Sequence, residues 1–142
     1  KPNTTTVQKV LETALAQGAY QKNVGWKHAG LAALASKYGL VGKTVDFSTY
    51  SNDSALKNFK KEVDAGPVVA SIRRGFNPKS PYGHLVVITG YDDKVVYYND
   101  PGKRDGKKSV LIADFMKGWK KRLIVIRPPA EKKEIVKVTY SY

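Results

Sequence analysis

The hydrophobic pattern of this chain changes its period at Gly66-Pro67, and this change limits the possible folds more than any other feature of the sequence. Before it, apolar residues recur at helical spacing; after it, short runs rich in Val, Ile and Tyr are separated by turn residues. Helices are expected at residues 6–17, at 26–38 and after N-cap candidates Asn52, Asp53 and Ser54. Strands are expected at residues 68–72, 84–91, 95–99, 109–112 and 122–127, with a short helix at 114–117 before the last. N-terminal helices followed by an antiparallel sheet predict an α+β domain.

Residues 83–101 predict a β-hairpin, with His84 entering its first strand and Asp100 leaving its second. A two-residue loop at Asp92-Asp93 would place these two side chains on opposite faces of the sheet. A three-residue loop, residues 91–93, would pair Gly90 with Lys94 and set His84 directly opposite Asp100, with β-carbons about 5 Å apart. A contact between His84 and Asp100 therefore requires the loop with an odd number of residues.

An aspartate beside a histidine has two readings. The carboxylate can accept the imidazole N–H and fix its tautomer, as in a triad of nucleophile, base and orienting residue. Alternatively, the two residues form a surface pair or a turn cap. Asn99 also has two alternative roles, since its side chain could form a hydrogen bond near the His84–Asp100 pair or stabilise the turn.

The segment GHLVVITGYD at residues 83–92, followed by Asn99-Asp100-Pro101, resembles the His and Asp signature of family thirty-nine of the cysteine peptidases. These bacteriocin-processing-type bacterial enzymes have a papain-like fold. Supporting similarity lies at residues 23–31, 35–40, 65–69 and 115–119, so the resemblance covers most of residues 5–128. It implies that His84 is the general base, that Asp100 orients it, and that the substrate is a peptide, one candidate being a peptide cut after glycine.

The family's catalytic Cys, and the Gln just upstream of it, match no residue of this chain. The sequence contains no cysteine, and Gln8 and Gln17 precede none, so the chain as given is predicted to be inactive alone. The favoured explanation is a peptidase domain incomplete at its N-terminus. The alternative is a catalytically inactive cell-surface or polyanion-binding module on the same fold.

A missing catalytic helix would have consequences for packing. We expect it to uncover Val86, Ile88 and Val96, which a companion N-terminal fragment, an exchanged dimer or the C-terminal tail would then cover. The domain is expected to span residues 1–128, and residues 129–142 form a tail or edge strand after Pro128-Pro129. The family context favours an extracellular or cell-envelope location.

A formal charge of +13 favours weak binding to anionic polymers, although no nucleic-acid motif occurs. No cofactor or metal motif is found, and no apolar run is long enough for a transmembrane segment. His28 has no partner at ligand spacing, and a solvent-facing or capping role is favoured for it. Trp26 and Trp119 are expected in the core with their N–H groups bonded.

Overall fold

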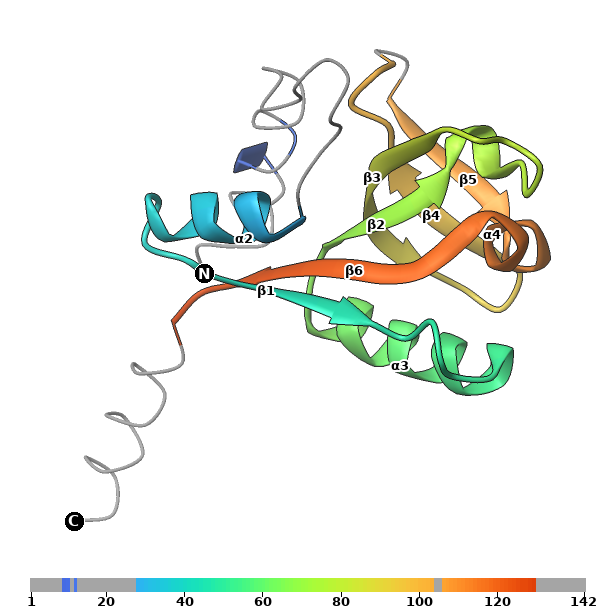
Figure 1. Ribbon diagram of the computed structural model, residues 1–142, viewed down its shortest axis with the longest axis horizontal. Helices are drawn as coiled ribbons and strands as arrows, with labels where there is room; N and C mark the ends of the chain where they lie inside the picture. Colours follow the sequence, from blue (N-terminus) through green and yellow to red (C-terminus); the bar gives the residue numbers. More distant parts are fainter. Residues whose placement is uncertain (1–8, 11, 13–27, 104–105, 130–142) are drawn as a thin grey trace.

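The computed structural model describes residues 9–10, 12, 28–103 and 106–129 as an antiparallel six-stranded sheet with helices on both faces (Figure 1). The helices are α2 (His28–Ser36), α3 (Asn52–Ala65) and α4 (Ile112–Gly118), and Arg74–Phe76 forms a short 3-10 turn, η1. The strands are β1 (Val41–Asp46), β2 (Val68–Arg73), β3 (Gly83–Tyr91), β4 (Val95–Asn99), β5 (Lys107–Leu111) and β6 (Trp119–Arg127). Their order across the sheet is β1-β6-β2-β3-β4-β5. The α+β, papain-like architecture expected from the sequence is confirmed.

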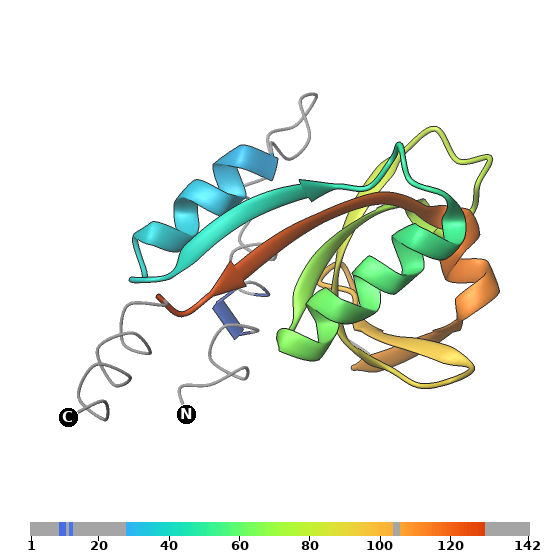
Figure 2. The same ribbon diagram turned by 90° about the horizontal axis from the view of Figure 1, so that it is seen from below.

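The central strands bury both of their faces, because successive side chains point to opposite sides of the sheet. One face carries Val68, Ala70, Val86 and Leu123 beneath α3 and α4. The other carries Val69, Leu85, Val87, Ile124 and Ile126 beneath α2. Figure 2 shows α2 and α3 on opposite sides of β1 and β6.

An aromatic cluster fills the centre of the larger core. The ring of Phe59 from α3 lies 4.7 Å from that of Phe115 and 5.2 Å from that of Trp119, centroid to centroid. Trp119 is buried, and its Nε1–H donates to the carbonyl of Arg122 at 3.1 Å. The expectation for Trp119 is confirmed, whereas Trp26 lies outside the described residues.

Val86, Ile88 and Val96 are fully buried, so the expectation that a missing helix would expose them is wrong. They belong to the same core cluster as Phe59 of α3 and Phe115 of α4. The described helices α3 and α4 pack against the face that these three residues occupy.

Several predicted boundaries need correction. Strand β1 was not predicted and lies between α2 and α3, so the helices do not all precede the sheet. The residue that caps α3 is Ser51, whose side chain accepts from the Ser54 N–H at 3.2 Å, rather than one of the three candidates after it. Of the predicted first helix, Lys9, Val10 and Glu12 are described and helical. The predicted tail strand lies outside the described residues.

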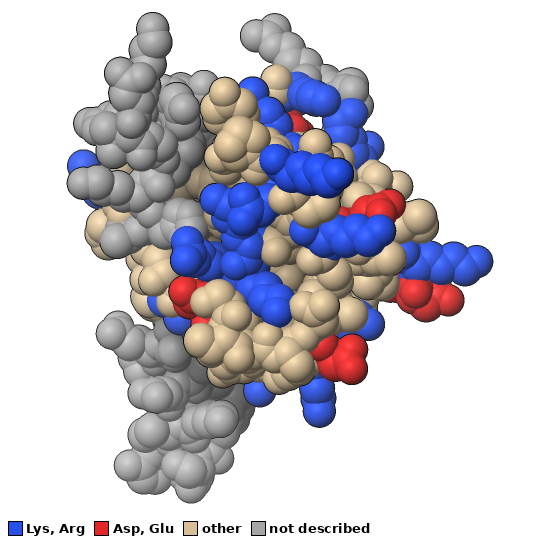
Figure 3. Space-filling model, turned by 45° about the vertical axis from the view of Figure 1, so that its right-hand side comes forward, with Lys and Arg blue, Asp and Glu red and all other residues tan. Residues whose placement is uncertain are grey.

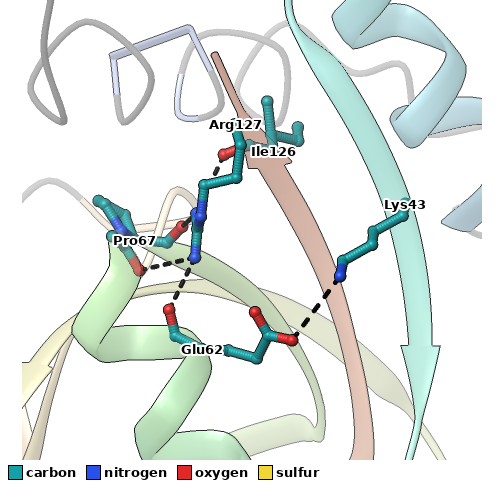
Figure 4. A network of polar contacts seen from close by, with 6 residues as sticks. Lys43, Glu62, Pro67, Ile126 and Arg127 are labelled. Atoms are coloured by element: carbon teal, nitrogen blue, oxygen red, sulfur yellow. Dashed lines mark hydrogen bonds and ion pairs between the residues drawn. The ribbon is translucent and has the colours of Figure 1, made fainter. Parts of the chain in front are cut away.

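Arg127, at the end of β6, joins this strand to the junction between α3 and β2 (Figure 4). Its guanidinium donates to the carbonyls of Glu62 and Pro67, both at 2.7 Å, to that of Ile126 at 3.0 Å and to that of Gly66 at 3.3 Å. These acceptors include carbonyls that the end of a helix leaves unpaired. Burial lowers the pKa of Arg127, and the nearby Glu62 carboxylate opposes that effect.

Candidate active site

The hairpin of β3 and β4 positions the two predicted site residues. Tyr91 pairs with Val96 and Gly90 with Tyr97, and residues 92–94 connect the two strands, one position later than the predicted three-residue loop. Asp92 organises this loop, since its Oδ1 accepts from the N–H groups of Lys94 and Val95, both at 2.8 Å. The predicted pairing of Gly90 with Lys94 is therefore wrong.

A β-bulge at Thr89 shifts the strand register so that His84 and Asp100 lie on the same face of the sheet. Beyond it the pairs are Ile88 with Tyr98 and Val87 with Asn99, so Thr89 is an extra residue on β3. Continuing this register places Asp100 opposite Val86, two residues from His84. Without the shift, Asp100 would stand opposite Val87 and face away from His84.

His84 and Asp100 are in direct contact. Nε2 of the imidazole lies 2.7 Å from Oδ1 of the carboxylate, and the two side chains are 23% and 14% exposed. The same Oδ1 accepts from the N–H of Gly102 at 2.9 Å. The expected proximity is confirmed, although the residues are diagonal neighbours and not a direct cross-strand pair.

The arrangement also fixes the tautomer of His84. An ionised carboxylate can only accept, so Nε2 carries the proton and a neutral imidazole keeps its lone pair on Nδ1. No described residue bonds Nδ1. The pair can therefore take a proton at Nδ1, with Asp100 balancing the charge that results.

Gly102 lies against both His84 and Asp100, and this position was not predicted from the sequence. A β-carbon at this position would lie 3.3 Å from Asp100 Oδ1 and 3.6 Å from His84 Cε1. The glycine thus lets the backbone approach the carboxylate and imidazole closely. Neither the Gly-Tyr-Asp-Asp turn nor the Asn-Asp-Pro-Gly run of the sequence indicates that Gly102 lies beside His84 and Asp100.

Asn99 does not join the pair. Its Nδ2 donates to Glu12 Oε1 at 2.6 Å, and its buried Oδ1 has no partner within the part of the chain that the structure describes. Neither sequence-based reading of Asn99 included a bond to a residue so distant in the chain. Gln8, Gln17 and the side chain of His28 lie outside the described residues.

One groove in the structure is not lined by His84 or Asp100. It is an open groove of about 540 Å³ between α2 and β1, lined by residues that include Ala33, Ser36, Val41 and Lys43. Its lining contains neither member of the pair, so it offers no direct support for catalysis.

Positive charge dominates the surface. The sequence has 25 Lys and Arg against 12 Asp and Glu, and Figure 3 shows blue side chains gathered over one face. The acidic partners are few; Arg122 lies 3.4 Å from Asp46, Lys43 3.9 Å from Glu62 and Lys117 4.0 Å from Asp114. Within the described ranges, no group of His, Asp and Glu could hold a metal ion, and no helix is long and apolar enough to cross a membrane.

Comparison with known structures gives the same fold. A double glycine motif protease from an AMS/PCAT transporter, solved in complex with the leader peptide, aligns with a TM-score of 0.55 and 22% identity over 76% of this chain. A protein described as a C39-like peptidase from Bacillus anthracis aligns with a TM-score of 0.55 and 26% identity over 74% of this chain. This chain spans 64% and 60% of the lengths of these two structures.

The peptidase domain of Streptococcus ComA, a bifunctional ABC transporter of a quorum-sensing pathway, has a TM-score of 0.54 and 18% identity. That alignment covers 85% of this chain and 77% of the ComA domain. No curated protein matches the chain. A family model described as the Peptidase_C39 like family matches residues 2–123. This chain therefore belongs to the Peptidase_C39 like family and forms a peptidase-like domain with its papain-like fold.

Proposed function

We propose that His84 and Asp100 are the base and the orienting residue of a cysteine peptidase whose nucleophile lies outside this sequence. The observation that carries the proposal is the 2.7 Å contact between His84 Nε2 and Asp100 Oδ1. It leaves Nδ1 as the proton acceptor, and the Gly102 N–H holds the carboxylate in place. Family membership supports a peptide-bond substrate.

The chemistry follows from this geometry. Nδ1 of His84 takes the proton of a cysteine thiol, and the thiolate attacks the carbonyl carbon of the scissile bond. The imidazolium then gives that proton to the leaving amine, and a thioester remains. Water attacks the thioester with His84 again as base, which frees the thiolate. Asp100 stabilises the imidazolium and holds its ring in one tautomer.

The substrate in this proposal is a peptide. One structure with the same fold is a double glycine motif protease solved with the leader peptide. By analogy, this domain would cut after a small residue such as glycine.

The test compares this chain with a longer polypeptide that includes the encoded sequence before Lys1. If that sequence supplies a cysteine, the longer protein should cleave glycine-containing peptides and be alkylated by iodoacetamide, whereas this chain should do neither. His84→Ala should abolish cleavage, and Asp100→Asn should reduce it strongly while peptide binding persists. Cleavage that survives His84→Ala would refute the proposed base.

A second candidate is a catalytically inactive binding module on the same scaffold. It is favoured by the absence of cysteine from the 142 residues and by the charge of +13. An upstream coding sequence without cysteine, together with peptide binding but no cleavage, would select it.

A further inference from the structure

We propose that residues 135–140 add a further strand to the sheet, outside β1 and parallel to it. The proposal is independent of the proposed function, because it needs neither a nucleophile nor a peptide substrate. It rests on the free edge of β1, on the groove beside this edge and on the point where the chain leaves β6.

Strand β1 has backbone groups without a partner along its outer side. The Phe47 N–H donates to the Lys121 carbonyl at 2.7 Å, so this pair is hydrogen-bonded, and every second residue of β1 before it also faces β6. The N–H and C=O groups of Gly42 and Thr44 therefore point away from β6, at the margin of the sheet. No described residue bonds these outward groups.

Such an edge can accept another strand. Its backbone groups form a template for pairing unless proline, a bulge or a covering segment blocks them. Strand β1 pairs with β6 in continuous register over all six of its residues and contains no proline. Nothing in β1 itself therefore obstructs the addition of a strand.

A groove follows the same edge beneath α2. It is lined by the consecutive residues 40–44 together with Ala32, Ala33 and Ser36 of α2. Figure 2 shows α2 lying along β1, and this close approach depends on Gly42, where a β-carbon would collide with the Ala32 carbonyl. The small side chains of α2 leave room in the groove for the larger side chains of an added strand.

Residues 135–140 have the composition of a strand. In the run Ile-Val-Lys-Val-Thr-Tyr, every residue except Lys137 is β-branched or aromatic. Alternation would put one wholly apolar set on one face, and a mixed set on the other: Val136, Val138 and Tyr140, and Ile135, Lys137 and Thr139. The apolar set suits the groove beneath α2.

The path of the chain favours β1 over the other free edge. Arg127 pairs with Val41, so the chain leaves β6 beside the start of β1, and Pro128-Pro129 cannot continue the ladder. The position outside β1 is two strand spacings from β6, about 10 Å, and residues 128–134 can span about 23 Å. The position outside β5 is five spacings away, about 24 Å, which leaves no slack in this connection.

The first test uses the absence of cysteine from the sequence, since two introduced cysteines can then react only with each other. The Thr44 side chain lies on the α2 face of β1, because its partner Ile124 belongs to the core beneath α2. Thr44→Cys is combined in turn with a single cysteine at each position from 135 to 140. Mild oxidation should form an intramolecular disulfide with at least one of three variants, Val136→Cys, Val138→Cys and Tyr140→Cys.

The matched controls are the three substitutions on the opposite face, Ile135→Cys, Lys137→Cys and Thr139→Cys, which should not form the disulfide. Equal yields at all six positions would overturn the proposal, because a segment without a fixed face meets Thr44 from every position. Disulfide-linked dimers would also overturn it, because the added strand would then come from a second copy of the chain.

The second test measures amide hydrogen exchange at Gly42 and Thr44 in the full chain. In parallel strands, residues whose side chains share a face point their N–H groups the same way, so the Lys137 N–H would point toward β1. Lys137→Pro removes this donor from the middle of the added strand. Exchange at Gly42 and Thr44 should then become about tenfold faster than in the wild-type chain, the effect of about one hydrogen bond.

Lys132→Pro is the matched control, since it makes the same substitution in the connection before the strand, and exchange should stay as in the wild-type chain. Protection of both amides that survives Lys137→Pro would assign the edge to another segment and refute the proposal. Unprotected amides in the wild-type chain would refute it as well. Neither test involves cleavage, so both leave the role of His84 untouched.

Discussion

Asp100 accepts a hydrogen bond from Nε2 of His84 although the two residues stand two positions out of register across β3 and β4. Diagonal neighbours in an antiparallel pair are about 7–8 Å apart at the backbone, so both side chains must lean toward each other. The Gly102 N–H supports this lean by binding the same carboxylate oxygen. The bulge at Thr89 puts His84 and Asp100 on one face of the sheet, and Gly102 leaves room for the backbone to approach both side chains.

Deleting Thr89 should preserve the contact between His84 and Asp100. The pairs on either side of this residue, Ile88 with Tyr98 and Gly90 with Tyr97, are already consecutive on β4. Removing the extra residue therefore leaves a regular ladder with the same register. Nitrogen-15 NMR of the imidazole should still report a proton on Nε2.

Deleting Asn99 is the matched control for that experiment. It moves Asp100 opposite Val87 and so onto the other face of the sheet, and the Nε2 signal of a fixed tautomer should be lost. The opposite pattern, with the tautomer lost in the first deletion and kept in the second, would contradict the register.

Arg127→Met should lower the free energy of unfolding by about 2 kcal/mol, because it leaves carbonyls at the end of α3 and the start of β2 without their charged donor. Arg127→Lys should recover only part of the loss, since one ammonium cannot reach all four acceptors. Urea unfolding provides the measurement. Lys43→Met, which removes the exposed half of the ion pair with Glu62, should cost less than about 1 kcal/mol. A loss from Lys43→Met equal to that from Arg127→Met would argue against the role assigned to the guanidinium.

The turn of the β3–β4 hairpin should make stability depend on pH through Asp92. Hydrogen bonds from the Tyr97 hydroxyl, and then from the N–H groups of Lys94 and Val95, hold the pKa of Asp92 below its ordinary 3.8. The ionised carboxylate therefore stabilises the fold above pH 3.8, and this contribution is lost as pH falls through the lower pKa of the folded state.

The stability difference between the wild-type chain and Asp92→Asn should accordingly be largest near neutral pH and shrink in acid. Asp93→Asn removes the same charge but none of these hydrogen bonds, so it should show a smaller difference. Urea unfolding across this pH range decides the matter, and a difference that grows in acid would reverse the assignment.

Binding to anionic polymers should be weak and strongly dependent on salt. With 25 basic residues and few acidic partners, affinity for heparin or single-stranded DNA arises from release of counterions. Fluorescence anisotropy should show a fall of about tenfold or more between low and physiological salt. Tight binding that ignores salt would point to a specific nucleic-acid site.

The sequence predicted those elements whose apolar pattern matches their burial. Strands β2, β3, β4 and β6 contain Val and Ile runs, and α3 carries Phe59 and Val63 at helical spacing. Strand β1 was not predicted because it is an edge strand, with Val41 55% exposed, and its partner β6 lies far along the chain. No local sequence pattern predicts the pairing of two strands so far apart in the chain.

The contact between His84 and Asp100 could be predicted from the sequence, whereas the register that produces it could not. The signature around His84 and Asp100 is local, but the register between them depends on a bulge at a residue, Thr89, that suits a regular strand equally well.

The position of β6 between β1 and β2 dictates when the domain can form during synthesis on the ribosome. Until Trp119–Arg127 has left the exit tunnel, β1 has no partner strand and β2 pairs only with β3. Until then the Val and Ile side chains of β2 and β3 lack the neighbouring strand that covers them, and such exposed apolar surface is prone to aggregation. A translation product that stops before β6 contains both members of the His84–Asp100 pair, but it cannot assemble the sheet that supports them.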